Sequence, residues 1–176
     1  GRMEFGPRAL GGRSIIACPT DPEMQKKINL KIKFRESFRP FAPIVMEDFV
    51  SEYFDFEGTS PYMLMVSKVH QSKLLKISDK EQCLDGLKKL GVPRSVVPSI
   101  THVDNSARIQ TVSSSSNPFF FKLLSAYHAK TGTPLLINTS FNVRGEPIVN
   151  TPEDAYKCFL KTNMDVLVLE NFIVLK

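Results

Sequence analysis

The chain has 176 residues, of which 42% are hydrophobic and 23% are charged, and its net charge is +5. This length suits one domain with a core of its own, and this composition excludes disordered and fibrous proteins. The positive excess favours anionic ligands, although many solvated surfaces carry as much charge.

The first part of the chain predicts strands with one helix between them. Apolar runs favour strands over residues 14–18, 42–46 and 62–69. The segment Thr20-Asp-Pro-Glu23 indicates a helix start, because a capping oxygen precedes a proline and an acid. Met24, Ile28 and Ile32 then form the expected buried stripe of this helix.

The sequence changes character between residues 71 and 98. A lysine-rich, amphipathic piece covers residues 80–90, and Gly91-Val-Pro93 follows it. Acids are interleaved with the lysines and aromatic residues are absent, so a solvated face is favoured over a membrane or nucleic-acid arm. We interpret residues 71–98 as a peripheral excursion with a helix, and expect the next strand over residues 108–112.

The last part of the chain predicts further helices and strands. One helix begins at Asn117-Pro118 and ends near Gly132, and another begins at Thr151, where Asp154 completes a capping box. Strands are expected over residues 135–138, 166–169 and 172–175. The alternation of strands and helices predicts an α/β fold.

The run from Pro134 to Pro147 carries the strongest indication of a ligand site. An apolar strand leads directly into Thr139, Ser140, Asn142 and Arg144. Continuous apolar strands are typical of parallel sheets, whose ligands sit beyond the carboxyl ends of the strands. We expect these side chains at such an edge, although an ordinary polar turn fits the pattern about as well.

Cationic clusters interrupt the expected elements and predict phosphate binding. Arginine offers a rigid fork to phosphate oxygens and lysine a mobile point charge, and each charge-assisted hydrogen bond contributes about 1.5–3 kcal/mol. A surface cation or an ion pair is the simpler account of any one residue. The shared setting of these clusters, beside glycine and proline residues in turns, favours one common phosphate-binding site. The clusters contain Arg8 and Arg13; Lys31, Lys33 and Arg35; Arg39; and Arg108.

The sequence argues against a hydrolase or a metalloenzyme. The three histidines fall in no H-x-x-H pattern, and neither a G-x-S-x-G elbow nor a Walker lysine loop occurs. The three cysteines form no C-x-x-C pair, so we predict no metal ligands, reduced thiols and a cytoplasmic location. No apolar run approaches the ~20 residues that a membrane span needs. His102 and Asp104 are expected either to form a structural pair or to touch ligand.

Several motifs, taken together, resemble the carboxy-terminal domain of NodU/CmcH/TobZ-type O-carbamoyltransferases. They are GRMEFGPRALG (1–11), FRPFAP (38–43), THVD (101–104), AR (107–108) with QTV (110–112), and NTSFNVRGEPI (138–148). Residues 139–147 are also similar to the Thr-Ser-Ala-Asn-x-Ser-Gly run of the YrdC family, which makes carbamoyl-type adenylates. The resemblance implies one YrdC-like domain over residues 1–176. Its expected α/β fold is a twisted, open, mixed sheet flanked by helices, with a basic concave ligand cleft.

The resemblance also implies an activity. Such a domain uses ATP and carbamoyl phosphate to form carbamoyl-adenylate, and Mg²⁺ would be held mainly by the nucleotide and water. A separate amino-terminal, metal-binding transferase domain then passes the carbamoyl group to an acceptor hydroxyl. We therefore expect this chain to be a piece of a larger two-domain enzyme.

The motif positions assign roles to individual residues. The resemblance implies that Arg8, Lys33 and Arg39 are the catalytic cations that meet carbamoyl phosphate and the nucleotide phosphates. Which of Lys31, Lys33 and Arg35 contacts phosphate is left open. The nucleotide-side residues are expected to be Arg108, Thr139, Ser140 and Asn142, with Arg144, whose role is open because the YrdC pattern has a less charged residue there.

Two other functions remain as alternatives. A basic concave surface attracts RNA backbones, but the sequence has no aromatic stripe interleaved with arginine, so nucleic-acid binding is disfavoured. The other alternative is a non-catalytic docking domain that only shapes the acceptor site of its partner.

Overall fold

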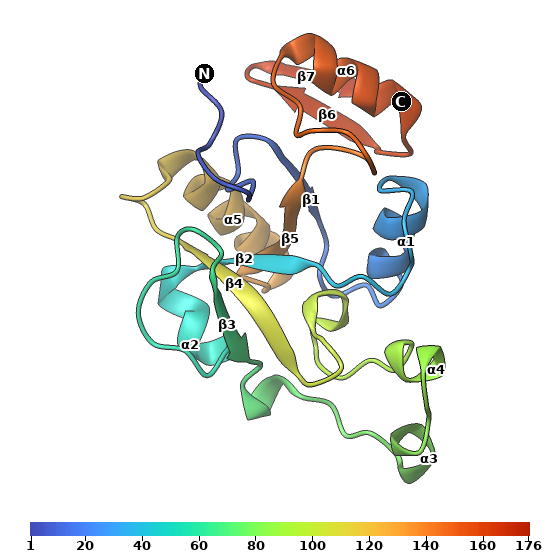
Figure 1. The fold of residues 1–176 in the computed structure, drawn as a ribbon. Helices are drawn as coiled ribbons and strands as arrows, with labels where there is room; N and C mark the ends of the chain where they lie inside the picture. The colour runs from blue at the N-terminus through green and yellow to red at the C-terminus, as the bar shows by residue number, and fades with distance from the viewer.

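The computed structural model describes residues 1–176, apart from the side chain of Leu87, and shows a central five-stranded sheet with helices packed around it (Figure 1). The spatial order of the strands is β1-β5-β2-β4-β3. The strands of this sheet are β1 (Ser14–Ala17), β2 (Ala42–Met46), β3 (Met65–Lys68), β4 (Ser106–Val112) and β5 (Leu135–Ser140). A separate two-stranded ribbon consists of β6 (Val166–Leu169) and β7 (Phe172–Leu175).

The helices differ widely in length. The longer ones are α1 (Met24–Lys31), α5 (Pro118–Thr131) and α6 (Pro152–Lys161). Single turns of helix are α2 (Val50–Tyr53), α3 (Asp79–Gln82) and α4 (Leu87–Leu90), with 3₁₀ turns at Glu47–Phe49, Gln71–Lys73 and Pro98–Ile100. Among the residues described, none of these helices is long and apolar enough to cross a membrane.

The sheet is mixed, which confirms the predicted fold class. β2 and β4 are parallel, whereas β5 is antiparallel to both of its neighbours, β1 and β2. The expectation that β5 presents its polar residues at a parallel edge is therefore wrong. Because β5 runs against its neighbours, Ser140 lies opposite Ser14, at the beginning of β1.

Most predicted elements are present with small shifts in their ends. The expected strand over residues 62–69 is confined to β3, and β4 begins two residues earlier than predicted. The helix start at Thr20 is wrong, because α1 begins at Met24. Asp21 instead closes a turn in which its Oδ1 accepts the N–H of Glu23 at 2.9 Å. Residues 80–90 form no continuous helix, because α3 and α4 flank a break at Gly86, where φ is +57°.

The core has two parts, one on each face of the sheet. Successive side chains of a strand point to opposite faces, so Ile44 and Val45 of β2 belong to different clusters. The cluster beneath α5 contains Ile44, Met46, Val112, Phe120, Leu124 and Leu136. The larger cluster includes Ile28 of α1, Val45, Ile109, Ile137 and Phe159 of α6. These two packed layers fix the sheet on which the candidate site is built (Figure 1).

Candidate anion-binding site

One group of cations lines a pocket of about 220 Å³ between the end of α1 and the turn that follows β5. The two segments are joined by the backbone, because the N–H of Arg144 donates to the carbonyl of Lys33 at 3.2 Å. We call this the basic pocket. Its lining residues are Lys33, Arg35, Arg39, Ser140, Asn142, Val143, Arg144 and Gly145.

Lys33 is buried in the wall of the basic pocket and is surrounded by oxygens. Its Nζ donates to the carbonyl and hydroxyl of Ser140, and to the carbonyl and Oδ1 of Asn142 at 3.0 and 2.9 Å. The hydroxyl of Ser140 also donates to Asn142 Oδ1 at 2.8 Å. The ammonium group therefore holds the turn after β5 in place. Burial, with Arg35 nearby, lowers the pKa of Lys33 to about 7.

Arg35 is held beside Lys33 by a buried asparagine and an aromatic ring. Its Nε donates to Oδ1 of Asn29 at 2.7 Å, and its guanidinium lies 5.1 Å from the ring centre of Phe41. Asn29 Nδ2 in turn donates to the carbonyl of Arg39 at 2.8 Å. One buried amide thus positions both arginines of this segment, and burial together with the charge of Arg39 lowers the pKa of Arg35.

Glu36 lies between the two exposed arginines of the basic pocket. Its Oε2 is 3.0 Å from Nε of Arg39, and its Oε1 is 4.0 Å from Nη1 of Arg144. Its own backbone N–H and the two guanidinium groups lower the pKa of this carboxyl. Both arginines are solvent-exposed. Exposed ion pairs of this kind are weak, so an incoming phosphate can compete for both guanidinium groups.

A second group of cations consists of Arg8, in the loop before β1, and Arg108, on β4. Burial and the nearby charge of Arg8 lower the pKa of Arg108. The Nε atoms of both arginines are buried and have no hydrogen-bond partner among the residues that the structure describes. Arg108 Nη2 lies 3.9 Å from the sulfur of Met63. Two guanidinium groups that repel each other would be stabilised by an anion bound between them.

The loop that carries Arg8 is fastened to the sheet by buried amides. Asn138, on β5, donates through Nδ2 to the carbonyl of Ala9 at 3.0 Å and to Oε1 of Gln110 at 2.6 Å. Gln110, on β4, donates through Nε2 to the carbonyl of Leu10 at 3.0 Å. Sequence reasoning gave these two amides no role of their own, although a polar residue within an apolar strand is the signal that could have found them.

The same loop is closed by its own glutamate. Oε1 of Glu4 accepts the backbone N–H groups of Leu10, at 3.1 Å, and of Gly12. Gly11, between them, has a φ of +130° and lies against the ring of Phe120. Close packing at Gly11 and the two hydrogen bonds at Glu4 therefore fix the path of the loop from Glu4 to Gly12.

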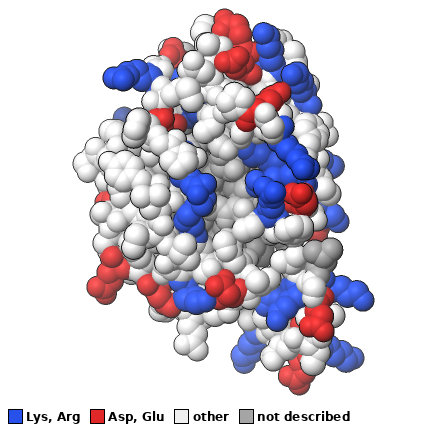
Figure 2. Space-filling model, in the orientation of Figure 1, with Lys and Arg blue, Asp and Glu red and all other residues white. Residues whose placement is uncertain are grey.

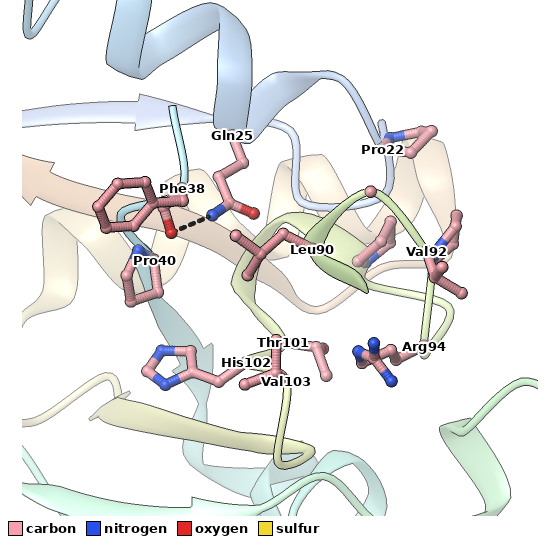
Figure 3. A pocket seen from close by; sticks show the side chains of 13 residues that line it. Pro22, Gln25, Phe38, Pro40, Leu90, Val92, Arg94, Thr101, His102 and Val103 are labelled. Atoms are coloured by element: carbon pink, nitrogen blue, oxygen red, sulfur yellow. Dashed lines mark hydrogen bonds between the residues drawn. The ribbon is translucent and has the colours of Figure 1, made fainter. Parts of the chain in front are cut away.

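A second pocket, of about 190 Å³, lies between the segment of Arg39 and the segment that leads into β4. We call it the proline-lined pocket, because Pro22, Pro40, Pro93 and Pro98 contribute to its wall. In Figure 3, Phe38, Pro40 and His102 lie together on one side of it, and Val92 and Arg94 lie on the other. The side chain of Gln25 donates to the carbonyl of Phe38 at 3.2 Å and holds that wall (Figure 3).

His102 connects the proline-lined pocket to the arginine pair. Burial lowers the pKa of His102, while Asp104 raises it and Arg108 lowers it further. Asp104 is engaged elsewhere, because it accepts the hydroxyl of Ser106 at 2.6 Å and pairs with Lys68 at 3.1 Å. The Ser106 hydroxyl is the main reason why the pKa of Asp104 falls to about 2. Asp104 is thus held by Ser106 and Lys68, whereas His102 lines the proline-lined pocket.

The remaining predicted residues lie outside the two pockets. By strand alternation the side chain of Thr139 points to the face opposite that of Ser140. Arg13 donates to the carbonyls of Gly1 and Asn150 at 3.0 and 3.2 Å, so it ties chain segments together. Lys31 is exposed at the end of α1.

Figure 2 shows positive side chains on both sides of a hollow in the centre of one face of the molecule. Among the described residues, Arg35, Arg39 and Arg144 line the basic pocket, and Arg8 lies near Arg108. Such an arrangement can hold several phosphate oxygens at once, because each guanidinium offers a fork of donors.

The model of the family described as "Carbamoyltransferase C-terminus" matches residues 1–176. The chain belongs to this family. The predicted resemblance is thereby confirmed.

Similar proteins extend well beyond the part that they share with this domain. It is 58% identical over its full length to an uncharacterised protein of Synechocystis sp., of which it covers 29%. It is 42% identical to nodulation protein NolO of Bradyrhizobium diazoefficiens, again covering 29%. Nodulation protein U of Rhizobium tropici is 42% identical over 90% of the chain, which covers 24% of that protein. The chain therefore spans less than a third of the length of these relatives.

Proposed function

We propose that this chain binds ATP and carbamoyl phosphate and forms carbamoyl-adenylate. The observation that carries the proposal is the presence of two groups of cations, one that lines the basic pocket and one formed by Arg8 and Arg108, with Glu36 as the carboxylate that bridges Arg39 and Arg144. Family membership supports carbamoyl as the transferred group, and the cations support substrates that are anionic.

The two groups of cations suit different parts of the proposed substrates. The exposed side chains of Arg39 and Arg144 pair with Glu36, so they can turn toward phosphate oxygens. Arg8 and Arg108 are partly buried, with Nε atoms that lack partners among the described residues, so they suit a fixed anion. We propose that the phosphates of both substrates lie between these groups. The phosphates would neutralise the repulsion between the guanidinium groups and so stabilise the bound state.

The proposed reaction needs no nucleophilic side chain. Hydrolysis of carbamoyl phosphate breaks the bond between the carbonyl carbon and the bridging oxygen, and gives carbamate and phosphate. A carbamate oxygen then attacks the α-phosphorus of ATP, and the bond to the leaving pyrophosphate breaks. The product is carbamoyl-adenylate. The arginines would neutralise the charge that builds up on the phosphoryl oxygens, which is the main task in phosphoryl transfer.

Mg²⁺ would enter this site with the nucleotide. Within the described residues, no three His, Cys, Asp or Glu side chains come together to hold a metal ion. Mg²⁺ commonly keeps several waters and binds substrate phosphates, so ATP can carry it as part of the substrate. The chain's own contribution is then the set of guanidinium groups.

The test of this function is the conversion of ATP to AMP and pyrophosphate by the purified domain with Mg²⁺. We expect AMP only when carbamoyl phosphate is present, and a loss of at least about 100-fold in Arg39→Ala, because a charge-assisted bidentate contact is removed. Lys26→Ala is the matched control, since Lys26 is exposed and pairs with Glu23 at 3.8 Å. Wild-type turnover in Arg39→Ala would refute the role of that arginine.

Binding measurements with ATP and RNA separate the proposal from its alternatives. Phe34 and Phe38 are exposed beside Arg35 and Arg39, an arrangement that could also stack on bases. RNA binding that is indifferent to ATP and weakens steeply with salt would replace the nucleotide proposal. Failure to bind any nucleotide would favour a docking domain. Transfer of the carbamoyl group to an acceptor hydroxyl is proposed to need the amino-terminal part of a larger protein.

A further inference from the structure

The β6–β7 ribbon presents one wholly aliphatic face to solvent. In its antiparallel register, Val166 lies opposite Leu175 and Val168 lies opposite Ile173. Residues opposite each other share a face, so these four side chains form one surface. Their exposed fractions are 49% and 56% for the valines, and 69% for both Ile173 and Leu175. We call this surface the outer ribbon face.

The other face of the same ribbon belongs to the core. Leu167 is buried, and Leu169 and Val174 pack against the larger hydrophobic cluster. α6 covers this inner side, as Figure 1 shows. The helix begins at a capping box, in which the hydroxyl of Thr151 accepts the N–H of Asp154 at 3.1 Å. Core packing thus fixes which side of the ribbon faces outward.

The end of the ribbon is also fastened. The ammonium of Lys176 lies 4.9 Å from the ring centre of Phe159 and donates to the carbonyl of Thr162. The turn between the strands has a positive φ of +52° at Glu170. These contacts hold β7 beside β6, so the outer ribbon face is a fixed apolar surface. Large exposed apolar surfaces are typical of interaction sites.

The lengths of similar proteins indicate what covers this face. The relatives from Synechocystis sp. and Bradyrhizobium diazoefficiens each carry about 71% of their length outside the shared region, since the chain covers 29% of them. The shared region is described as a C-terminus. A surface on the same polypeptide is present at a high effective concentration, which favours it over a separate partner.

We infer that the outer ribbon face packs against an apolar surface of the amino-terminal part of the full-length protein. This inference rests on the proposed two-part organisation. The ribbon face itself carries no charge, because its four residues are valine, isoleucine and leucine. Its partner surface is therefore apolar as well. The contact would fasten the adenylate-forming domain to the part that receives the carbamoyl group.

Thiol labelling tests the inference directly. Val168→Cys is introduced into the full-length protein and into the 176-residue chain, and each is treated with a maleimide under native conditions. Cys83 is free and exposed, and serves as an internal reference. Peptide mass spectrometry separates the two thiols. We expect the introduced thiol to react at least about 10-fold more slowly in the full-length protein, relative to Cys83, and at an ordinary rate in the 176-residue chain, because a thiol must be accessible to react.

Two outcomes would overturn the inference. Equal relative labelling rates in both proteins would mean that the face stays open. Slow labelling in the 176-residue chain, together with a dimer in sedimentation, would assign the face to a second copy. Ile173→Cys gives an independent position if Val168→Cys does not fold. The readout needs no turnover, so protection of the thiol without AMP formation would refute the proposed reaction and leave the contact standing.

Discussion

Lys33 and Arg39 differ in what holds them, although both are cations of the same pocket. Lys33 is buried and donates to oxygens of Ser140 and Asn142, whereas Arg39 is exposed and pairs with Glu36. A lysine whose donors are already used by the protein is a positioning residue for the turn after β5. An exposed arginine with one weak partner is free to bind ligand.

This difference predicts different stabilities for two variants. Lys33→Met removes the donor and leaves several oxygens without a partner, so we expect the free energy of unfolding to fall by about 1–3 kcal/mol. Arg39→Ala removes an exposed side chain, and we expect a change within about 0.5 kcal/mol. Urea unfolding followed by circular dichroism measures both. Equal stability of the two variants would contradict the positioning role of Lys33.

The lowered pKa of Lys33 predicts a pH dependence of stability. In the folded protein this amine loses its proton near pH 7, whereas in the unfolded chain it does so near its ordinary pKa of 10.5. Between these values the unfolded chain binds more protons, so the free energy of unfolding rises with pH. Below pH 7 both states are protonated and this contribution is constant. We expect the rise between pH 7 and 10.5 to shrink in Lys33→Met.

The measurement is a series of urea unfolding curves at several pH values for the wild-type protein and for Lys33→Met. Arg39→Ala is the control and should keep the wild-type slope, because guanidinium groups do not titrate in this range. If the free energy of unfolding rises equally with pH in the wild-type protein and in Lys33→Met from pH 7 to 10.5, Lys33 does not titrate as described.

At the residue scale, the sequence could predict which cations gather but not what holds them. The predicted site residues that line the basic pocket are Lys33, Arg39, Ser140, Asn142 and Arg144, whereas Arg8 and Arg108 do not line it. The roles of Asn138 and Gln110 depend on contacts between the sheet and a loop about a hundred residues earlier in the chain. Local patterns do not report such pairings, so the anchoring of Arg8 could not be derived.

At the scale of elements, strands were predictable and their directions were not. The apolar run of β5 was expected to belong to a parallel sheet, yet β5 is antiparallel to β1 and β2. A strand with both faces covered is apolar whichever way its neighbours run. The polar residues at its end are positioned by Lys33 and the turn, and not by a shared carboxyl edge.

The loop before β1 gives a prediction at this scale. Gly11 has a φ of +130°, and a Cβ there would lie 2.8 Å from Cδ2 of Phe120. Gly11→Ala therefore combines backbone strain with a clash against the core, and we expect a loss of at least about 2 kcal/mol in stability. Because the loop carries Arg8, we also expect weaker ATP binding.

A matched glycine separates the two causes. Gly6 has a φ of +108°, but no atom lies within 4 Å of the place that a Cβ would take, so Gly6→Ala carries strain alone. Thermal unfolding and ATP titration of both variants provide the measurement. A loss in Gly6→Ala as large as that in Gly11→Ala would show that contact with Phe120 is not what fixes the loop.

At the scale of the whole molecule, the excursion of residues 71–98 leaves and rejoins the rest of the fold through a narrow base. Leu75 N–H donates to the carbonyl of Arg94 and Val96 N–H donates to that of Lys73, both at 2.9 Å. The chain leaves and returns at neighbouring points, with α3 and α4 beyond them (Figure 1). Composition predicted a peripheral excursion over residues 71–98, but Arg94, Ser95 and Val97 are buried, and Val97 belongs to the larger core cluster. The contribution of this segment to the proline-lined pocket could not be derived from the sequence.

This geometry predicts that most of the excursion is dispensable for folding. We expect replacement of residues 76–93 by an Asn-Gly turn to leave one cooperative unfolding transition, with Tm within about 4 °C of wild type, because a short turn can close so narrow a base. Ile100→Ala, just beyond the excursion, should cost about 2–5 kcal/mol, since Ile100 is buried in the core. Calorimetry of both variants provides the measurement. A broad or absent transition in the shortened protein would instead make the excursion part of the folding unit.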